Sequence, residues 1–239
     1  MKNGKLAELI EKSPRTVFFG GAGVSTESGI PDFRSENGLF KALEKYGKSP
    51  EILLSRSFFD AHPEVFFDYY RENLLITDVE PNSAHLALAR LEEKGKLSAV
   101  ITQNIDGLHQ KAGSSRVLEL HGSIYRNYCM KCGRHYGIEK IKETTGIPRC
   151  ECGGIIRPDV VLYEEIPPED TFDQALDEVR NASLMIVGGT SLVVYPAANL
   201  LQYFRGTVVL INLSPTYYDS IADLVIHEPI GKVFSELDV

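Results

Sequence analysis

Five short apolar runs recur along this chain, and each is followed at once by small or polar residues. The segments between them carry helical periodicity, most clearly over residues 82–94 and 168–180. Strands that alternate with helices form parallel sheets with right-handed crossovers. The alternation therefore predicts an α/β fold, a Rossmann-like doubly wound parallel sheet. The expected strands are Arg15–Phe19, Ser98–Thr102, Arg116–Leu120, Leu184–Val187 and Val208–Ile211.

The polar residues that follow these strands have a common place in such a fold. Ligands of an open parallel sheet bind outside the carboxyl ends of its strands. We call the polar segment that directly follows a strand its exit. One exit alone would be an ordinary turn, but five together supply glycine, amide, carboxylate and imidazole groups to one edge of the sheet. We therefore expect a binding site formed by Gly20–Gly23, Gln103–Asp106, His121–Ser123, Gly188–Ser191 and Asn212–Ser214.

Two stretches interrupt the alternation. Residues 37–78 look helical and aromatic without a strand pattern, and residues 124–157 contain every cysteine. We interpret both as insertions that make a smaller domain with a helical module and a metal-binding module. The predicted division is 1–36, 79–123 and 158–239 for the sheet domain, and 37–78 with 124–157 for the small domain.

The four cysteines form two close pairs joined by a short loop. Two such pairs are typical of a tetrahedral zinc site, and in a reducing compartment a disulfide explains them less well. Four thiolates leave no open position for water, so the expected metal is structural. His135 could compete as a ligand, but we expect it to be exposed. The predicted ligands are Cys129, Cys132, Cys150 and Cys152.

The glycine-rich turn Gly20–Gly23 permits two interpretations. It is either a tight strand-to-helix turn or a turn whose N–H groups approach a pyrophosphate. A dehydrogenase also needs an acidic residue about 20 positions later, at the end of the next strand, to bind the ribose. The next expected strand begins only near Ser98. The turn therefore suggests a dinucleotide without hydride transfer.

His121 stands out among the six histidines because it follows an expected strand on the polar edge. A neutral imidazole there can act as a general base, although a lone strand-end histidine would more simply bond to the backbone. No nucleophile elbow accompanies it, and the thiols are committed to metal. The nucleophile is therefore expected to come from the substrate.

The charge balance narrows the partners. Acidic residues number 33 against 25 basic ones, for a net charge of −8 and a pI of about 5.3. This balance opposes non-specific binding to nucleic acid or anionic membranes. No apolar run approaches the roughly 20 residues of a membrane span, and the first residues carry no secretory pattern. We therefore expect no nucleic-acid or membrane partner and a cytoplasmic location.

Taken together, the motifs resemble those of the sirtuins, NAD-dependent protein lysine deacylases, of the bacterial or archaeal type. They occur in the family's order over nearly the whole chain. They are Gly21–Arg34, Thr102–His109, Leu120–Gly122, the paired cysteines, Arg157–Val161, Gly189–Ser191 and Ile211–Asn212.

The resemblance implies NAD as co-substrate and one structural zinc ion. It implies contacts to NAD from three groups of residues. Those lining the site are Ala22, Thr26, Phe33 and Arg34, with Gln103 near the nicotinamide ribose. Those recognising the nicotinamide carboxamide are Ile105 and Asp106. Those holding the adenosine half are Thr190, Ser191, Asn212 and Leu213.

The resemblance also implies the reaction. The substrate amide oxygen attacks the ribose carbon and expels nicotinamide, which gives an alkylimidate. His121 then acts as general base, with Asn104 as its catalytic companion, and the products are free lysine and O-acyl-ADP-ribose. The acylated peptide would lie as an extended strand along Val160, Val161, Leu162 and Tyr163.

Two departures from the family pattern bear on substrates. Leu162 to Glu165 replaces the commoner aromatic-Gly-Glu, and the two acids suggest a preference for peptides with basic neighbours. Relatives that remove succinyl or malonyl groups carry a Tyr and, three residues later, an Arg. The matching positions here are Phe67 and Tyr70. Without that cation, we expect deacetylation and only weak desuccinylation.

The leading hypothesis is thus an NAD-dependent deacetylase acting on acetylated lysines of proteins or peptides. A mono-ADP-ribosyltransferase using the same NAD site is the second hypothesis. The third is a zinc-ribbon interaction protein without catalysis. The sequence makes no prediction of the oligomeric state.

Overall fold

The computed structural model describes residues 2–32 and 36–237 of the 239-residue chain. Its main sheet has six strands in the order β3-β2-β1-β7-β8-β9, and each neighbouring pair is parallel. This confirms the predicted fold class. The strands are β1 (Thr16–Gly20), β2 (Leu97–Thr102), β3 (Val117–Glu119), β7 (Leu184–Gly188), β8 (Thr207–Ile211) and β9 (Leu224–Ile226).

Burial on both faces explains why the strand sequences are continuously apolar. All five residues of β1 and of β7, the two central strands, are buried. Strands of a parallel sheet covered on both faces read as apolar runs without alternation. The five predicted strands are all present. The edge strand β9, three residues long and paired with β8, was not among the predicted strands.

Two layers of helices cover the sheet. One face packs against α1 (Lys2–Lys12), α6 (Ser83–Glu93) and α11 (Ile230–Ser235). The other face packs against α9 (Glu169–Asn181) and α10 (Leu200–Tyr203). Short helices near the carboxyl edge are η1 (Ala22–Val24), η2 (Thr26–Ser28), α7 (Leu108–Lys111), η3 (Ala197–Asn199) and η4 (Tyr217–Ile221).

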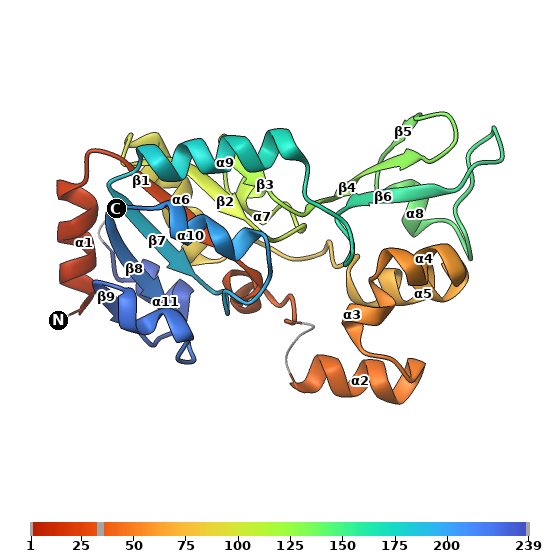
Figure 1. Cartoon of the computed structure of the whole chain (residues 1–239), viewed down its shortest axis with the longest axis horizontal. Helices are drawn as coiled ribbons and strands as arrows, with labels where there is room; N and C mark the ends of the chain where they lie inside the picture. The colour runs from red at the N-terminus through yellow and green to blue at the C-terminus, as the bar shows by residue number, and fades with distance from the viewer. Residues whose placement is uncertain (1, 33–35, 238–239) are drawn as a thin grey trace.

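A separate small sheet and a group of helices lie at the other end of the molecule, on the right of Figure 1. The small sheet has the order β5-β4-β6, and its pairs are antiparallel. Its strands are β4 (Gly122–Cys129), β5 (His135–Tyr136) and β6 (Ile156–Val160), and the short helix α8 (Glu139–Lys142) follows β5 in the chain. The helical module comprises α2 (Glu36–Tyr46), α3 (Pro50–Leu53), α4 (Arg56–Ala61) and α5 (Pro63–Asn73).

The helical module and the small sheet share one apolar core. Phe59, Phe66 and Phe67 of the helices pack in the same cluster as Ile124 and Ile156 of the strands. The two interrupting stretches therefore pack together. The predicted domain boundaries remain a prediction. Strand β4 crosses the predicted boundary after residue 123, and strand β6 crosses the predicted boundary after residue 157.

Across the described ranges, none of the helices has the length and apolar content needed to span a bilayer.

Candidate active site

A cavity of about 500 Å³ opens at the carboxyl ends of the parallel strands. It is lined by residues from the exits of β1, β2 and β3, by the segment after β6, and by helices α3 and α5. The predicted site residues among its lining are Ala22, Gln103, Asn104, Ile105, Asp106, His121, Val160, Val161, Leu162 and Tyr163. The polar exits of β1, β2 and β3 therefore meet at this cavity, at the edge that the sheet topology requires.

His121 lies between β3 and β4, where the chain passes from the large sheet to the small one. Its Nδ1 lies 3.0 Å from the main-chain oxygen of Gln103. Because a carbonyl only accepts, Nδ1 carries the proton of the neutral ring, and the lone pair resides on Nε2. The main-chain oxygen of His121 accepts from the Val161 amide at 3.0 Å. The imidazole is therefore oriented by the exit of β2 and by the segment after β6.

Asp106 is held in a buried hydrogen-bond network. Its carboxylate accepts from Ser25 Oγ at 2.6 Å and from the Leu108 amide at 2.9 Å. The Asn104 side-chain amide donates to Ser25 Oγ at 3.0 Å. Burial raises the pKa of Asp106, while the Ser25 hydroxyl acts in the lowering direction. Ser25 thus links the exits of β1 and β2, a role that the sequence analysis did not assign to it.

The exits of β7 and β8 are joined by a reciprocal pair of hydrogen bonds. The Thr190 amide donates to Asn212 Oδ1, and Asn212 Nδ2 donates to the Thr190 oxygen, both at 2.9 Å. Gln103 Nε2 lies 3.4 Å from Thr190 Oγ1. The exits of β2, β7 and β8 are therefore connected through buried side chains.

The glycine-rich turn packs directly on the exit of β7. The Gly23 amide donates to the Gly189 oxygen at 2.8 Å, and a Cβ at Gly23 would lie 2.8 Å from the Gly189 Cα. A side chain would separate the two segments. Close backbone packing alone therefore requires glycine at this position, whatever ligand the turn binds.

Of the other predicted cofactor residues, Thr26, Ser191 and Leu213 lie outside the described cavity lining. Thr26 begins η2 and donates from Oγ1 to the Gly23 oxygen at 3.0 Å. Ser191 and Leu213 are exposed. Phe33 and Arg34 lie outside the described residues.

The four cysteine sulfurs form one cluster in which every Sγ lies within 4.8 Å of the others. The closest pairs, Cys129–Cys152 and Cys132–Cys150, are 3.5 and 3.6 Å apart. Both separations exceed a disulfide bond of about 2.05 Å, and the cluster fits one zinc ion. Tyr136 Oη donates to Cys150 Sγ at 3.0 Å and lowers the pKa of that thiol to about 6. A thiolate is the form that binds metal.

The sequence matches the Sir2 family model over residues 21–196. The chain belongs to the Sir2 family. Curated relatives named NAD-dependent protein deacetylase include one from Clostridium acetobutylicum, 56% identical over 97% of this chain and 96% of its own. Another, from Clostridium perfringens, is 56% identical over 99% of this chain and 98% of its own.

Solved structures agree with this Sir2 assignment. A Sir2 variant bound to deacetylated p53 peptide and 3′-O-acetyl-ADP-ribose has a TM-score of 0.91 and 42% identity, covering 98% of this chain and 96% of that one. A Sir2 bound to p53 peptide and NAD+ has a TM-score of 0.89 and 41% identity over 98% and 96%. The fold and the sequence therefore agree over nearly the full length.

In this Sir2 protein, the cavity also has walls that the sequence analysis missed. These residues are Ser25, Ile30, Pro31, Glu51, Leu54, Asn73, Leu74, Pro167 and Val193–Pro196. Ser25, Ile30 and Pro31 lie within the Gly21–Arg34 motif, whereas the others carry no metal-ligand or catalytic pattern and are brought to the cavity by tertiary packing. The signal that could have found Ser25 is its place at the end of the glycine-rich turn.

Both positions expected to set acyl specificity in this Sir2 protein are buried. Phe67 belongs to the apolar core, whereas Tyr70 lines the cavity with its hydroxyl buried and without a hydrogen-bond partner among the described residues. Burial raises the pKa of Tyr70. The described lining contains Glu51, Asp106, Glu164 and Glu165 but neither lysine nor arginine.

Proposed function

We propose that this protein is an NAD-dependent protein deacetylase that removes acetyl groups from lysine side chains. The products are nicotinamide, O-acetyl-ADP-ribose and free lysine. The observation that carries the proposal is the position of His121, whose imidazole is fixed at Nδ1 in a cavity at the carboxyl edge of the sheet. Near full-length similarity to named deacetylases supports it.

The residues at this edge fit NAD. The glycine-rich turn runs into η1 and lies against the exit of β7, and the Asp106 carboxylate is positioned by Ser25 and Leu108 beside the cavity. Ala22, Thr26, Phe33, Arg34 and Gln103 would hold the ribose and phosphate groups. Ile105 and Asp106 would bind the nicotinamide carboxamide. The adenosine half would be held by Thr190, Ser191, Asn212 and Leu213.

NAD supplies the ribose carbon that accepts the acyl oxygen as nicotinamide leaves. The protein's own part is proton transfer and orientation. His121 accepts a proton at Nε2, because Gln103 keeps the Nδ1 proton in place. Asn104, whose side-chain amide donates to Ser25, holds that part of the cavity in a fixed arrangement.

The acyl-lysine substrate would lie along Val160–Tyr163. The absence of lysine and arginine from the described lining favours an uncharged acyl group over succinyl. Glu164 and Glu165 are engaged in contacts within the protein, which leaves Glu51 as the exposed carboxylate for a basic flanking residue.

The zinc ion is structural in this proposal because four thiolates complete its coordination. We place the enzyme in the cytoplasm, since a reducing compartment keeps the four zinc-binding cysteines from forming disulfides.

A panel of acyl-lysine peptides with mass detection of the products tests the function. Nicotinamide release that depends on the acetyl group, together with O-acetyl-ADP-ribose, supports deacetylation. Transfer of labelled ADP-ribose onto protein without loss of acetyl groups would favour mono-ADP-ribosylation instead. No turnover of NAD with any peptide would favour a non-catalytic zinc-ribbon interaction protein.

A further inference from the structure

The residue after the proposed substrate segment has an unusual backbone. Glu164 has a φ of +75°, in the left-handed region that non-glycine residues rarely occupy. Such conformations persist only where surrounding contacts enforce them, and they are frequent at ligand clamps. The contacts of Glu164 therefore indicate what holds it there.

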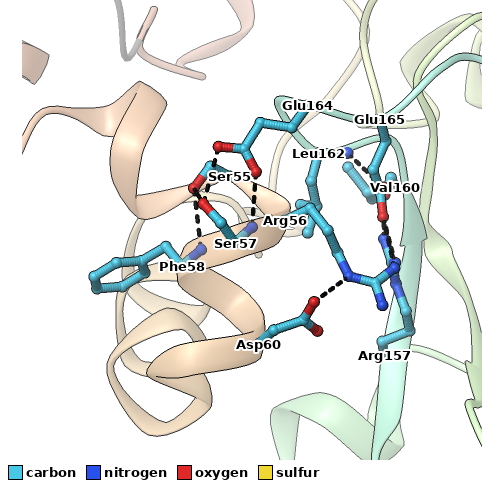
Figure 2. Close-up of polar contacts among 10 residues, drawn as sticks. All are labelled: Ser55, Arg56, Ser57, Phe58, Asp60, Arg157, Val160, Leu162, Glu164 and Glu165. Atoms are coloured by element: carbon cyan, nitrogen blue, oxygen red, sulfur yellow. Dashed lines mark hydrogen bonds and ion pairs between the residues drawn. The ribbon is translucent and has the colours of Figure 1, made fainter.

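The Glu164 carboxylate binds the first turn of α4. It accepts from the Ser57 amide at 2.8 Å and from Ser57 Oγ at 2.9 Å. Figure 2 shows the carboxylate facing this helix end, next to the N-cap residue Ser55. Amides in the first turn of a helix have no partner within the helix, so a carboxylate satisfies one of them and interacts favourably with the helix dipole.

The preceding residue is joined to the same helical module through its main chain. The Tyr163 amide donates to the Leu54 oxygen, and the Arg56 amide donates to the Tyr163 oxygen, each at 3.0 Å. These two bonds form an isolated parallel bridge between Ser55 and Tyr163. The end of the substrate segment is therefore attached to the junction of α3 and α4.

The next acidic residue, Glu165, contacts β6. Glu165 receives a bidentate contact from the buried Arg157 of β6, at 2.7 and 2.9 Å, and accepts from the Leu162 amide at 2.9 Å. Burial acts to raise the pKa of Glu165, but Arg157, the Leu162 amide and Arg56 together outweigh it, and the pKa is lowered. Glu165 also accepts from Arg56 Nη1 of α4 at 3.2 Å, so both adjacent acids attach the turn to α4, and Glu165 attaches it to β6 as well (Figure 2).

The other end of the segment is attached to the catalytic histidine. The Val161 amide donates to the His121 oxygen, and Val161, Leu162 and Tyr163 line the cavity. The segment therefore spans the distance from His121 to α4. The helical module consequently affects the placement of the peptide-contacting residues through the Tyr163 main chain, the Glu165–Arg56 contact and the contact between Glu164 and Ser57.

We propose that Glu164 is a positioning residue for the acylated peptide. Its carboxylate fixes the turn after Tyr163 on α4 and so holds Val161–Tyr163 in the geometry that the peptide meets. This inference rests on the proposed function, and it concerns peptide binding and not NAD binding, because the Glu164 contacts lie on the helical module. Glycine would accept the same φ but would lack the carboxylate.

Four variants test the proposal. Glu164→Gly removes both contacts while relieving the backbone conformation, and Glu164→Gln keeps an oxygen that accepts from the Ser57 amide. Ser57→Ala removes the hydroxyl contact alone. Glu93→Gly, at the exposed end of α6, is the matched control. The readouts are KM values for an acetyl-lysine peptide and for NAD, the peptide Kd from fluorescence anisotropy, and amide exchange of residues 160–165.

We expect Glu164→Gly to raise the peptide KM and Kd by about fivefold or more, with the NAD KM unchanged within about twofold. Exchange of the 160–165 amides should become faster. Glu164→Gln and Ser57→Ala should have smaller effects, and Glu93→Gly none.

Two results would overturn the inference alone: an unchanged peptide Kd in Glu164→Gly, or a parallel rise in the constants for peptide and NAD, which indicates general loosening. A wild-type protein that neither binds nor deacetylates the peptide overturns the proposed function as well.

Discussion

The Nδ1 proton of His121 is directed at the main-chain oxygen of Gln103, 3.0 Å away. This bond selects one tautomer and leaves Nε2 as the basic atom. The carbonyl belongs to the exit of a neighbouring parallel strand, so the register of the sheet determines the orientation of the base.

Replacing His121 tests its role as the base. We expect His121→Ala to lower the deacetylation rate by about 100-fold or more, because general base catalysis is worth this much. Circular dichroism and Tm should stay close to wild type, since the Val161 contact uses the His121 main chain. The control is His135→Ala, which alters an exposed histidine. Wild-type turnover in His121→Ala would refute the assignment.

Asp106 should affect NAD more than peptide. Asp106→Asn removes the charge that accepts from Ser25 and Leu108, so we expect the KM for NAD to rise about tenfold or more. The peptide Kd should remain unchanged. The measurement is a steady-state titration of each substrate, and an unaltered KM for NAD would contradict the proposed carboxamide contact.

Acyl selectivity follows from the cavity lining. The described lining contains neither lysine nor arginine, so this part of the cavity offers no such cation to an acyl carboxylate. We expect kcat/KM for a succinyl-lysine peptide to be about 100-fold or more below that for the acetyl-lysine peptide of the same sequence, because an unpaired buried charge is costly. Equal values for the two peptides would overturn this expectation.

Zinc removal should act on stability. Cys132→Ser removes one ligand of the cluster, and we expect loss of bound zinc, a lower Tm and faster proteolysis of the segment around residues 124–157. Metal analysis and limited proteolysis report these changes. A zinc-free protein with full thermal stability would show that the ion is dispensable for the fold.

Acid should destabilise the protein through two buried histidines. His85 and His109 lie with ring centroids 4.7 Å apart, and burial lowers the pKa of His85 to about 4 and that of His109 well below its ordinary value. The unfolded chain binds these protons near pH 6.5. The stability that the two neutral rings provide is therefore fully present above about pH 6.5. As the pH falls from there toward 4, the free energy of unfolding decreases by ~1.4 kcal/mol per pH unit for each histidine.

Urea unfolding at pH 7.5, 6.5 and 5.5 measures this slope. His109→Leu removes one of the two titrating rings. The slope of the free energy of unfolding against pH should then correspond to about one proton fewer than in the wild-type chain. An identical pH dependence in the two proteins would show that His109 does not contribute.

The sequence predicted the sheet well because its central strands are buried on both faces. Runs such as those containing Phe18 and Ile186 are fully buried, and continuous apolar runs of this length are typical of strands covered on both faces. The small sheet was not predicted as strands, since Tyr125 and Arg126 of β4 are exposed and break any apolar run. The edge strand β9 is too short to show a periodic pattern of apolar residues.

The candidate site was likewise predicted only in part. Topology alone brought together the exits that carry Gln103 and His121, because parallel strands end at one edge. The wall formed by Val193–Pro196 and the turn at Glu164 depend on packing between distant segments, which periodicity does not report. Phe33 and Arg34, expected to contact NAD, lie outside the described residues, so their placement stays a prediction.

The passage from β3 to β4 limits how relatives of this protein can be recombined. Only Leu120 and His121 separate the edge strand of one sheet from the first residue of the other. Gly122 has a φ of +78°, and a Cβ there would lie 2.0 Å from the Asp159 oxygen. A chimaera that exchanges the zinc-binding module must therefore take its splice points outside the Gly122–Asp159 contact, and it inherits the donor's histidine geometry along with the module.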